Sequence, residues 1–374
     1  MIKFLYTNIG RGHAFYLDGI VELLKKNGRV KFECHNVFEI SKDPALLAWR
    51  LARWLYKVGS TDSIIGKWYN SIRDKSEYNK NGLALRLMGQ DVRKWFLTDD
   101  TPLVVDHPVL VGILRGKKNL IYQHGEIAVP PQAVVSSADY VFVPLESSAA
   151  PFINAGYHKS QIIATGMCIE PDLIKQSETA YLKRLNRFKS NEPLTGAFFS
   201  SGAEPTTHVE KLILAVKSVV QSGGKAIVFA QRNGKVESAL AEFVQAGSMQ
   251  IVFNSFNSRE QLNGLTAKFF DQFDYLVAPS HERTNWALGL GLPIFILEPT
   301  IGPFAPLNKA ALHQAGVAES ICSISEARGF AARLADLRKF GNLTKMAESG
   351  WKKHPINGFH FIAEFLINKY VPSA

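Results

Sequence analysis

Short apolar runs alternate with longer amphipathic segments along the chain. Residues 3–8 form a strand-like run, and residues 13–26 place Phe15, Leu17 and Ile20 on one helical stripe. Further short apolar runs are predicted strands, at residues 30–38, 102–106, 119–123, 139–144 and 161–166. This order is typical of α/β units built on a mostly parallel sheet.

The same pattern repeats in the second half. Predicted strands at residues 195–201, 225–230, 250–256, 274–280 and 293–299 are separated by helices such as 207–220. The mostly polar residues 175–193 are predicted to be a linker. The sequence therefore predicts two doubly wound, Rossmann-like α/β domains facing a cleft, over residues 1–175 and 194–350. Residues 351–374 are predicted to form a C-terminal helix that packs back on the first domain.

Composition agrees with this architecture and excludes several classes of protein. Hydrophobic residues make up 46% and charged residues 20% of the 374 positions, which excludes disorder and favours two domains. The three cysteines, Cys34, Cys168 and Cys322, are too far apart to indicate a disulfide framework or a zinc site. No signal-peptide pattern or run of roughly 20 apolar residues is present. We expect a cytoplasmic protein without a metal or other cofactor.

Positive charge is concentrated in one segment. The formal net charge is +10, and residues 42–97 hold 11 lysines and arginines against five acids. Four of the six tryptophans lie in the same segment: Trp49, Trp54, Trp68 and Trp95. Basic residues mixed with tryptophan on amphipathic helices are typical of peripheral contact with the anionic inner face of a membrane. The alternative is an ordinary helical insert with tryptophans in the core and charges in solvent.

Two loops in the first half carry candidate chemistry. The first lies between a predicted strand and helix and consists of Gly10, Arg11, Gly12 and His13. Its backbone N–H groups can approach an oxygen-rich ligand, and its histidine can act as a general base. The second loop follows another strand and contains His124 and Glu126, which can take or orient a hydroxyl proton. The structural alternatives are a tight turn for the first loop, and a buried ring with a capping carboxylate for the second.

The second half offers candidates for binding an anionic donor. Ser200, Ser201 and Gly202 follow its first strand, where hydroxyl and amide groups can hold a diphosphate at a helix N-terminus. Arg232, after the next strand, can neutralise the same charge. A polar loop after a later strand adds Glu282, Arg283, Thr284 and Asn285.

The order of these motifs resembles the GT-B glycosyltransferases. NIGRGH, QHGE, SSG and GLPIFILEPTIGPFAPLN follow one another as in the lipid-acceptor group of the peptidoglycan N-acetylglucosaminyltransferase and the galactolipid synthases. The resemblance covers most of the chain except the helical insert. It implies that the loops of the first half, including Gly10, Gly12, His13, His124 and Glu126, face the acceptor.

For the second half, the resemblance implies donor contacts. Ser200 to Gly202 would meet the diphosphate, Phe256 would lie near the nucleobase, and Pro303, Phe304 and Asn308 would lie in the loop that meets the transferred sugar. Two departures affect donor identity. The ribose-binding Glu before Gly-Leu-Pro is missing, with Glu282 the nearest acid, and Phe304-Ala305-Pro306 stands in place of a glutamine-containing loop. The nucleotide is then held differently, or the sugar is less polar, such as a deoxysugar.

The leading hypothesis is a metal-independent, inverting transfer of a sugar from a nucleotide-sugar donor, foremost a UDP-sugar, to a hydroxyl of a membrane-associated, lipid-linked or glycan acceptor. His13 or Glu126 would take the proton, and Ser200 to Gly202 with Arg232 would stabilise the leaving diphosphate. One alternative is a sugar-nucleotide 2-epimerase of the same fold. Another is a non-catalytic binding protein for anions or nucleic acid, although no nucleic-acid recognition motif is present.

Overall fold

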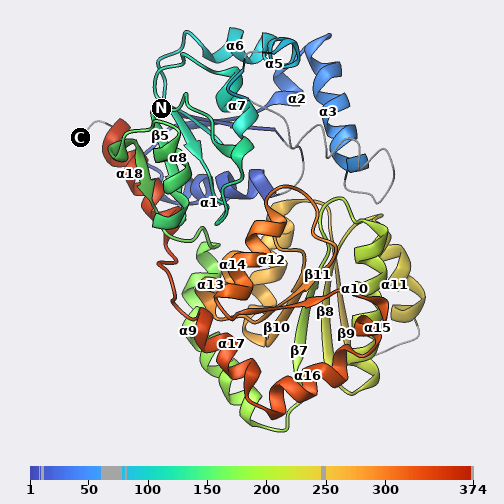
Figure 1. The fold of residues 1–374 in the computed structure, drawn as a ribbon. Helices are drawn as coiled ribbons and strands as arrows, with labels where there is room; N and C mark the ends of the chain where they lie inside the picture. Colours follow the sequence, from blue (N-terminus) through green and yellow to red (C-terminus); the bar gives the residue numbers. More distant parts are fainter. Residues whose placement is uncertain (8, 10–11, 60–77, 81, 246–249, 372–374) are drawn as a thin grey trace. The chain divides into compact units, whose positions relative to one another are not determined.

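The computed structural model describes residues 1–374 except 8, 10–11, 60–77, 81, 246–249 and 372–374. The chain forms two compact units, Met1–Ile169 together with Asn357–Ala374, and Glu170–Ile356 (Figure 1). The second unit is therefore one continuous segment, whereas the first is completed by the end of the chain. The predicted fold class, two doubly wound α/β domains, is confirmed.

Six parallel strands form the sheet of the first unit, in the order β2-β1-β3-β4-β5-β6. The strands are β1 (Ile2–Tyr6), β2 (Phe32–Asn36), β3 (Leu103–Val105), β4 (Leu120–Gln123), β5 (Tyr140–Val143) and β6 (Ile162–Ala164). Alternate residues fill two cores, with Phe4 and Val104 in one and Leu5 and Val105 in the other. Both faces are apolar because helices cover both sides of a parallel sheet.

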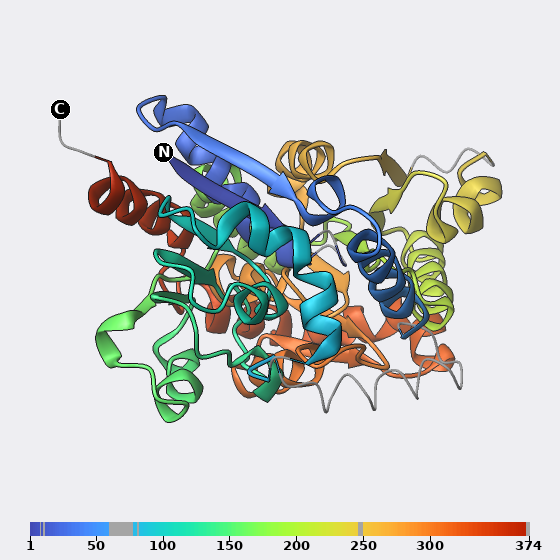
Figure 2. The same cartoon turned by 90° about the horizontal axis from the view of Figure 1, so that it is seen from above.

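The helices of the first unit come from both ends of the chain. They are α1 (Gly12–Asn27), α2 (Val37–Ile40), α3 (Ala45–Gly59), α5 (Leu83–Met88), α6 (Gln90–Phe96), α7 (Pro108–Ile113), α8 (Ala150–Asn154) and α18 (Gly358–Tyr370). The C-terminal α18 packs with the N-terminal elements of this unit (Figures 1 and 2). Gly19 permits the contact, because a Cβ there would lie 2.3 Å from the Phe359 ring.

The tryptophans of the basic segment, residues 42–97, differ in burial. Trp49 of α3 is fully buried, and its indole Nε1 donates to the carbonyl of Met88 at 2.9 Å. Trp54 and Trp95 are each 54% exposed, and Trp68 lies outside the described residues. The structural alternative, a tryptophan in the core, holds for Trp49, and membrane contact of the segment stays a prediction. None of the helices in the described part of the chain is long and apolar enough to cross a bilayer.

The second unit repeats the six-stranded parallel sheet, in the order β12-β11-β10-β7-β8-β9. The strands are β7 (Thr195–Phe199), β8 (Lys225–Gln231), β9 (Ile251–Phe256), β10 (Tyr275–Ala278), β11 (Ile294–Leu297) and β12 (Ala318–Ile321). The helices are α9 (Pro171–Lys189), α10 (Thr206–Gln221), α11 (Lys235–Gln245), α12 (Arg259–Phe269), α13 (Thr284–Leu290), α14 (Ala305–Gln314), α15 (Ile324–Arg328), α16 (Phe330–Lys339) and α17 (Asn342–Gly350).

The expected linker over 175–193 differs from the structure, which has the long helix α9 there. The buried face of α9 includes polar residues, above all the fully buried Arg184. The helix packs into the second unit, and yet its composition is mostly polar for this reason. The Arg184 guanidinium donates to the carbonyls of Phe273, Leu290 and Gly291 at 2.8–3.0 Å. These bonds compensate a charge that apolar packing alone could not bury.

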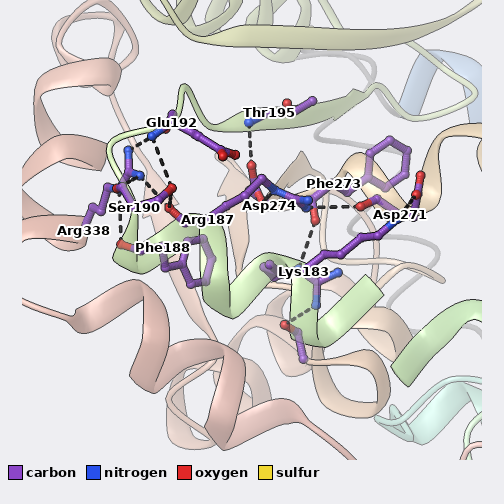
Figure 3. Close-up of polar contacts among 12 residues, drawn as sticks. Lys183, Arg187, Phe188, Ser190, Glu192, Thr195, Asp271, Phe273, Asp274 and Arg338 are labelled. Carbon is purple, nitrogen blue, oxygen red and sulfur yellow. Dashed lines mark hydrogen bonds and ion pairs between the residues drawn. The ribbon is translucent and has the colours of Figure 1, made fainter. Parts of the chain in front are cut away.

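Polar contacts also tie α9 to the amino ends of β7 and β10 (Figure 3). The Asp274 carboxylate accepts from Arg187 Nε at 2.6 Å and from the backbone N–H of Thr195 at 2.7 Å. Arg338 of α16 donates to the carbonyl of Phe188, near the end of α9, and to that of Glu192, just beyond it. The amino edge of this sheet is therefore closed by an internal ionic network.

Candidate active site

The carboxyl edge of the second sheet has a topological switch point between β7 and β10. From β7 the chain proceeds outward through β8 and β9, and then returns to β10 and proceeds the other way. The register pairs Phe198 with Val277, so the loops after β7 and β10 leave the sheet side by side. Open α/β sheets bind ligands at such a point. The predicted Ser200–Gly202 and Glu282–Asn285 loops are the two that flank it.

The loop after β7 begins with a buried hydroxyl, on Ser200, and is anchored at its far end by Glu204. Ser200 is 7% exposed, and its Oγ has no hydrogen-bond partner among the described residues. Ser201 is half-buried and Gly202 is exposed. Glu204, in the left-handed region at φ 43°, accepts the backbone N–H groups of Lys235 and Val236 with its carboxylate. Helix α10 then starts at Thr206 without a side-chain cap.

Arg283, in the loop after β10, joins the two flanking loops. Its guanidinium carbon lies 3.9 Å from the ring centroid of Phe199, the last residue of β7, and 5.3 Å from that of Trp286. Nη1 donates to Glu282 at 2.7 Å, whereas the buried Nε has no partner in the described part of the chain. The hydroxyl of fully buried Thr284 is also without one there. Asn285 is fully buried beside it.

Glu170 is an acidic residue at this edge that the sequence analysis did not identify. Its carboxylate accepts from the Trp286 indole N–H at 2.9 Å. Burial raises the pKa of Glu170 to about 7, although the indole hydrogen bond and Arg283 act in the opposite direction. Burial likewise lowers the pKa of His281. The switch point thus gathers groups whose pKa values are shifted by burial, which is frequent at functional sites.

The loop after β11 is held by hydrogen bonds to α10 and to the loop after β10. His208 of α10 bonds to the Pro299 carbonyl at 2.7 Å, and Lys211 donates to the Glu298 carbonyl at 2.5 Å. Asn308 is fully buried, and its Nδ2 donates to the Ser280 carbonyl at 3.0 Å. Asn308 therefore positions the loop, while the predicted contacts Pro303 and Phe304 are half-buried.

The two remaining candidates of this unit lie together on the other side of β7. Arg232 follows β8 and donates its backbone N–H to the carbonyl of Phe256, the last residue of β9, at 2.9 Å. The Arg232 side chain is exposed and Phe256 is buried. Arg232 also contributes to lowering the pKa of Glu237, after hydrogen bonds from Ser255 and Asn233. Its cation therefore already has a nearby carboxylate.

The first unit has its own switch point, between β1 and β3. Asp106, directly after β3, is 1% exposed and is a second acid that the sequence analysis did not identify. Glu126, after the neighbouring β4, is also buried. Burial raises the pKa of Tyr122 well above its usual value, and the charges of Asp106 and Glu126 add to the shift. Two buried acids therefore act on one phenol at the carboxyl edge of this sheet.

His124 has structural partners in the same place. Nδ1 bonds to the Tyr122 hydroxyl at 3.2 Å, and Nε2 bonds to the Ala128 carbonyl at 3.1 Å. The ring is 2% exposed, which matches the structural alternative considered for it. Gly10 and Arg11 lie outside the described residues, and so do the side chains at Gly12 and His13, the first two positions of α1.

Within the described residues, no group of three or more His, Cys, Asp or Glu side chains could hold a metal ion. The carboxyl edges of the two sheets offer hydrogen-bond donors, the buried Arg283 guanidinium and buried acids.

No protein-family model matches the sequence, and no curated protein matches it. Among solved structures, a UDP-GlcNAc 2-epimerase from Neisseria meningitidis bound to UDP-GlcNAc is similar, with a TM-score of 0.58 and 12% identity over 98% of this chain and 100% of that one. A UDP-N-acetylglucosamine 2-epimerase described as putative, from Listeria monocytogenes, has a TM-score of 0.56 and 14% identity over 100% of this chain and 97% of that one. MurG from Acinetobacter baumannii has a TM-score of 0.50 and 11% identity over 98% of this chain and 100% of that one. The likeness confirms the predicted fold, which glycosyltransferases and nucleotide-sugar epimerases share.

Proposed function

We propose that this chain transfers a sugar from a UDP-sugar to a hydroxyl group of a membrane-associated acceptor. The observation that carries the proposal is the switch point of the second sheet. There the buried Ser200 hydroxyl and Arg283 Nε have no hydrogen-bond partner in the described chain. Buried donors in native proteins are otherwise almost always paired, and a guanidinium and a hydroxyl can both donate to a diphosphate.

The chemistry requires one base and a stabilised leaving group. The acceptor oxygen forms a bond to the anomeric carbon, the bond from that carbon to the diphosphate oxygen breaks, and the acceptor proton passes to a carboxylate or imidazole. In this proposal Glu126, Asp106 or His13 takes the proton. The donors of the Ser200 loop, with Arg283 and Arg232, stabilise the charge that develops on the diphosphate.

A second candidate function is 2-epimerisation of a nucleotide sugar. It is favoured by the two buried acids of the first unit, Asp106 and Glu126, because epimerisation needs an acid and a base around one sugar and no acceptor. The two similar epimerase structures share the fold, which by itself does not select between the functions.

Binding and turnover test these functions separately. UDP should bind the purified chain in calorimetry, and the exposed Lys345→Met variant should bind it equally well. The chain should release UDP from a UDP-sugar only with an acceptor, and Glu126→Gln and Asp106→Asn identify the base through losses of about 100-fold or more. Conversion of UDP-GlcNAc without acceptor selects the epimerase, and absence of UDP binding contradicts both functions.

The membrane part of the proposal is supported by one face of α3. Leu47, Leu51 and Trp54 are spaced by four and three residues, so they share a helical stripe, and each is more than half exposed. Arg50 and Arg53 are exposed on the same helix. An apolar stripe flanked by cations matches an anionic bilayer surface, where Trp lies at the headgroup level.

Vesicle flotation tests the α3 surface. Arg50→Gln should weaken binding to anionic vesicles by about 1 kcal/mol at low salt and less at high salt. Leu51→Ser with Trp54→Ser should weaken it at any salt concentration, because interfacial apolar contact is lost. Phe340→Ser, which removes an exposed aromatic ring from the second unit, is the control. If the parent chain does not float with anionic vesicles, a soluble acceptor replaces the membrane in this proposal.

A further inference from the structure

The indole of Trp286 connects the Arg283 guanidinium to the carboxylate of Glu170. The guanidinium carbon lies 5.3 Å from the centroid of the Trp286 ring, and the indole N–H donates to the Glu170 carboxylate at 2.9 Å. Trp286 is 1% exposed, so an indole N–H without an acceptor would be costly there. The hydrogen bond to Glu170 therefore fixes the orientation of the ring that Arg283 contacts.

Helix α9 holds α13 at both ends. Glu170 directly precedes α9 and bonds to Trp286 in the first turn of α13. Arg184, farther along α9, donates to the carbonyls of Leu290 and Gly291, where α13 ends. Arg283 is the residue directly before α13. The position of the Arg283 guanidinium therefore depends on the contacts that α9 and Glu170 make to α13.

The charge of Arg283 acts on two carboxylates. Glu282 accepts from Nη1 at 2.7 Å, whereas the buried Nε has no partner among the described residues. Burial raises the pKa of Glu170 to about 7, Arg283 lowers it, and Glu282 raises it. The same two charges act on His281. The other charged groups on and around α9 face partners of their own: Asp172 with Lys175, Lys183 with Asp271, Arg187 with Asp274, Glu178 with Lys352, and Glu348 with Tyr181.

We propose that Glu170 positions the donor-binding Arg283 through Trp286, and that binding of a diphosphate at Arg283 is accompanied by uptake of a proton at Glu170. This inference rests on the proposed nucleotide-sugar function. A diphosphate at Nε brings negative charge to a cation that already faces two carboxylates, and nearby negative charge favours the protonated form of a carboxyl group. The proton comes from the solvent and joins the Glu170 carboxylate.

The hydrogen bond to the indole persists in both protonation states. A protonated carboxyl group keeps an oxygen that can accept from the Trp286 N–H, so the ring stays oriented when Glu170 takes up its proton. Because linkage between two binding events is reciprocal, UDP should bind more tightly at a pH where Glu170 is already protonated. Glutamine at position 170 imitates this neutral state and retains the acceptor.

Calorimetry of UDP binding in buffers of different ionisation enthalpy measures the proton uptake. Near pH 7 the parent should take up a larger fraction of a proton than Glu170→Gln, and the difference should disappear at about pH 5, where Glu170 is protonated with or without UDP. From about pH 6 to 8, UDP affinity of the parent should fall about 5-fold relative to that of the variant. The phosphate groups of UDP ionise alike in both experiments, so the difference belongs to Glu170.

A second variant tests the positioning role. Glu170→Gln should match the UDP affinity of the parent at about pH 6, whereas Glu170→Leu, which offers the indole no acceptor, should bind UDP about 5-fold more weakly. Glu178→Gln, on an exposed acid of α9, is the matched control and should behave like the parent in both measurements.

The outcomes separate this inference from the proposed function. Equal proton uptake by the parent and Glu170→Gln, with intact UDP binding, overturns the linkage and leaves the proposed function in place. Equal UDP affinity of Glu170→Gln and Glu170→Leu overturns the positioning role. If Glu170→Leu folds poorly, the comparison of the parent with Glu170→Gln still decides the linkage. Absence of UDP binding to the parent overturns both the inference and the function.

Discussion

The two edges of the second sheet are built from the same strands and differ in how their buried polar groups are paired. At the amino edge, the Asp274 carboxylate is paired on both oxygens, by Arg187 and by Thr195 (Figure 3). At the carboxyl edge, the Ser200 hydroxyl and Arg283 Nε are buried without partners in the described chain. The amino edge neutralises its buried carboxylate within the chain, although Nη2 of Arg184 there has no partner among the described residues, whereas the carboxyl edge retains unused donors on both loops of the switch point.

The difference separates stability from binding within a single domain. Paired buried groups contribute to folding when the pair is intact, and removing one partner leaves the other as a penalty. Unpaired buried donors already carry that penalty, which a ligand can relieve. Substitutions at the amino edge should therefore change unfolding, and those at the carboxyl edge should change ligand affinity.

The largest effect is expected from Arg187→Met at the amino edge. It leaves the fully buried Asp274 without its cation and should lower the free energy of unfolding by about 3 kcal/mol in urea denaturation. Lys183→Met removes a cation from the exposed pair with Asp271 and should change it by less than about 1 kcal/mol. Similar losses from both variants would contradict the distinction between the buried and exposed pairs.

Arg283→Met should act mainly on binding. It removes the guanidinium that stacks on Phe199 and, in the proposed function, bonds to the diphosphate. UDP affinity should fall by about 10-fold to 100-fold, since hydrogen bonds to charged groups contribute roughly 1.5 to 3 kcal/mol. Calorimetry measures this loss, with Arg232→Ala as the comparison across β7. An unchanged affinity in Arg283→Met would remove this residue from the site.

Ser200→Ala sharpens the comparison because its two effects should have opposite signs. Deleting a buried hydroxyl that lacks a partner should leave the free energy of unfolding unchanged or raise it by up to about 1 kcal/mol. The same change should weaken UDP binding by roughly 0.5 to 1.5 kcal/mol, the usual net value of one hydrogen bond. Parallel denaturation and calorimetry test both effects, and a clear loss of stability would mean that the hydroxyl already has a structural role.

Glu170→Gln should change the pH dependence of stability. The pKa of Glu170 is raised by burial to about 7 from a usual value of 4.5, so the folded chain holds this proton more tightly than the unfolded one. Its contribution to stability is full below about pH 4.5 and disappears as the pH rises through about 7. The Glu170→Gln variant should lack this pH-dependent contribution to the free energy of unfolding. Fluorescence of Trp286, which donates to Glu170, should change near pH 7 in the parent only.

Much of the fold follows from the apolar runs of the sequence. The runs at 195–201 and 274–280 became β7 and β10 because each is too short for a helix and is buried on both faces. Glycine, serine and other polar residues directly after these runs predicted binding loops at the carboxyl edge, because the loops that follow neighbouring parallel strands lie side by side there. The predicted Ser200 and Arg283 lie on adjacent loops for this reason.

Other features depend on burial that no local pattern reveals. The apolar stripe of α9 is interrupted by Arg184, which the helix can bury only because three carbonyls from distant segments surround it. Asp106 directly follows the short strand β3, which lies between β1 and β4 inside the sheet, and it is buried there. Glu170 meets Trp286 across 116 positions of sequence. Trp49 and Trp54 lie five positions apart on α3, and packing against α5 decides which of them is covered.

The return of the chain to the first unit sets an order for its biosynthesis. The second unit is complete once residue 356 has been made, whereas the first lacks α18 until residue 370 has been made. Until then the α1 surface around Gly19 and Phe15, which the Phe359 ring covers in the finished protein, remains open to solvent. The second unit can therefore finish folding first, and the first unit can complete its core only after α18 has been made.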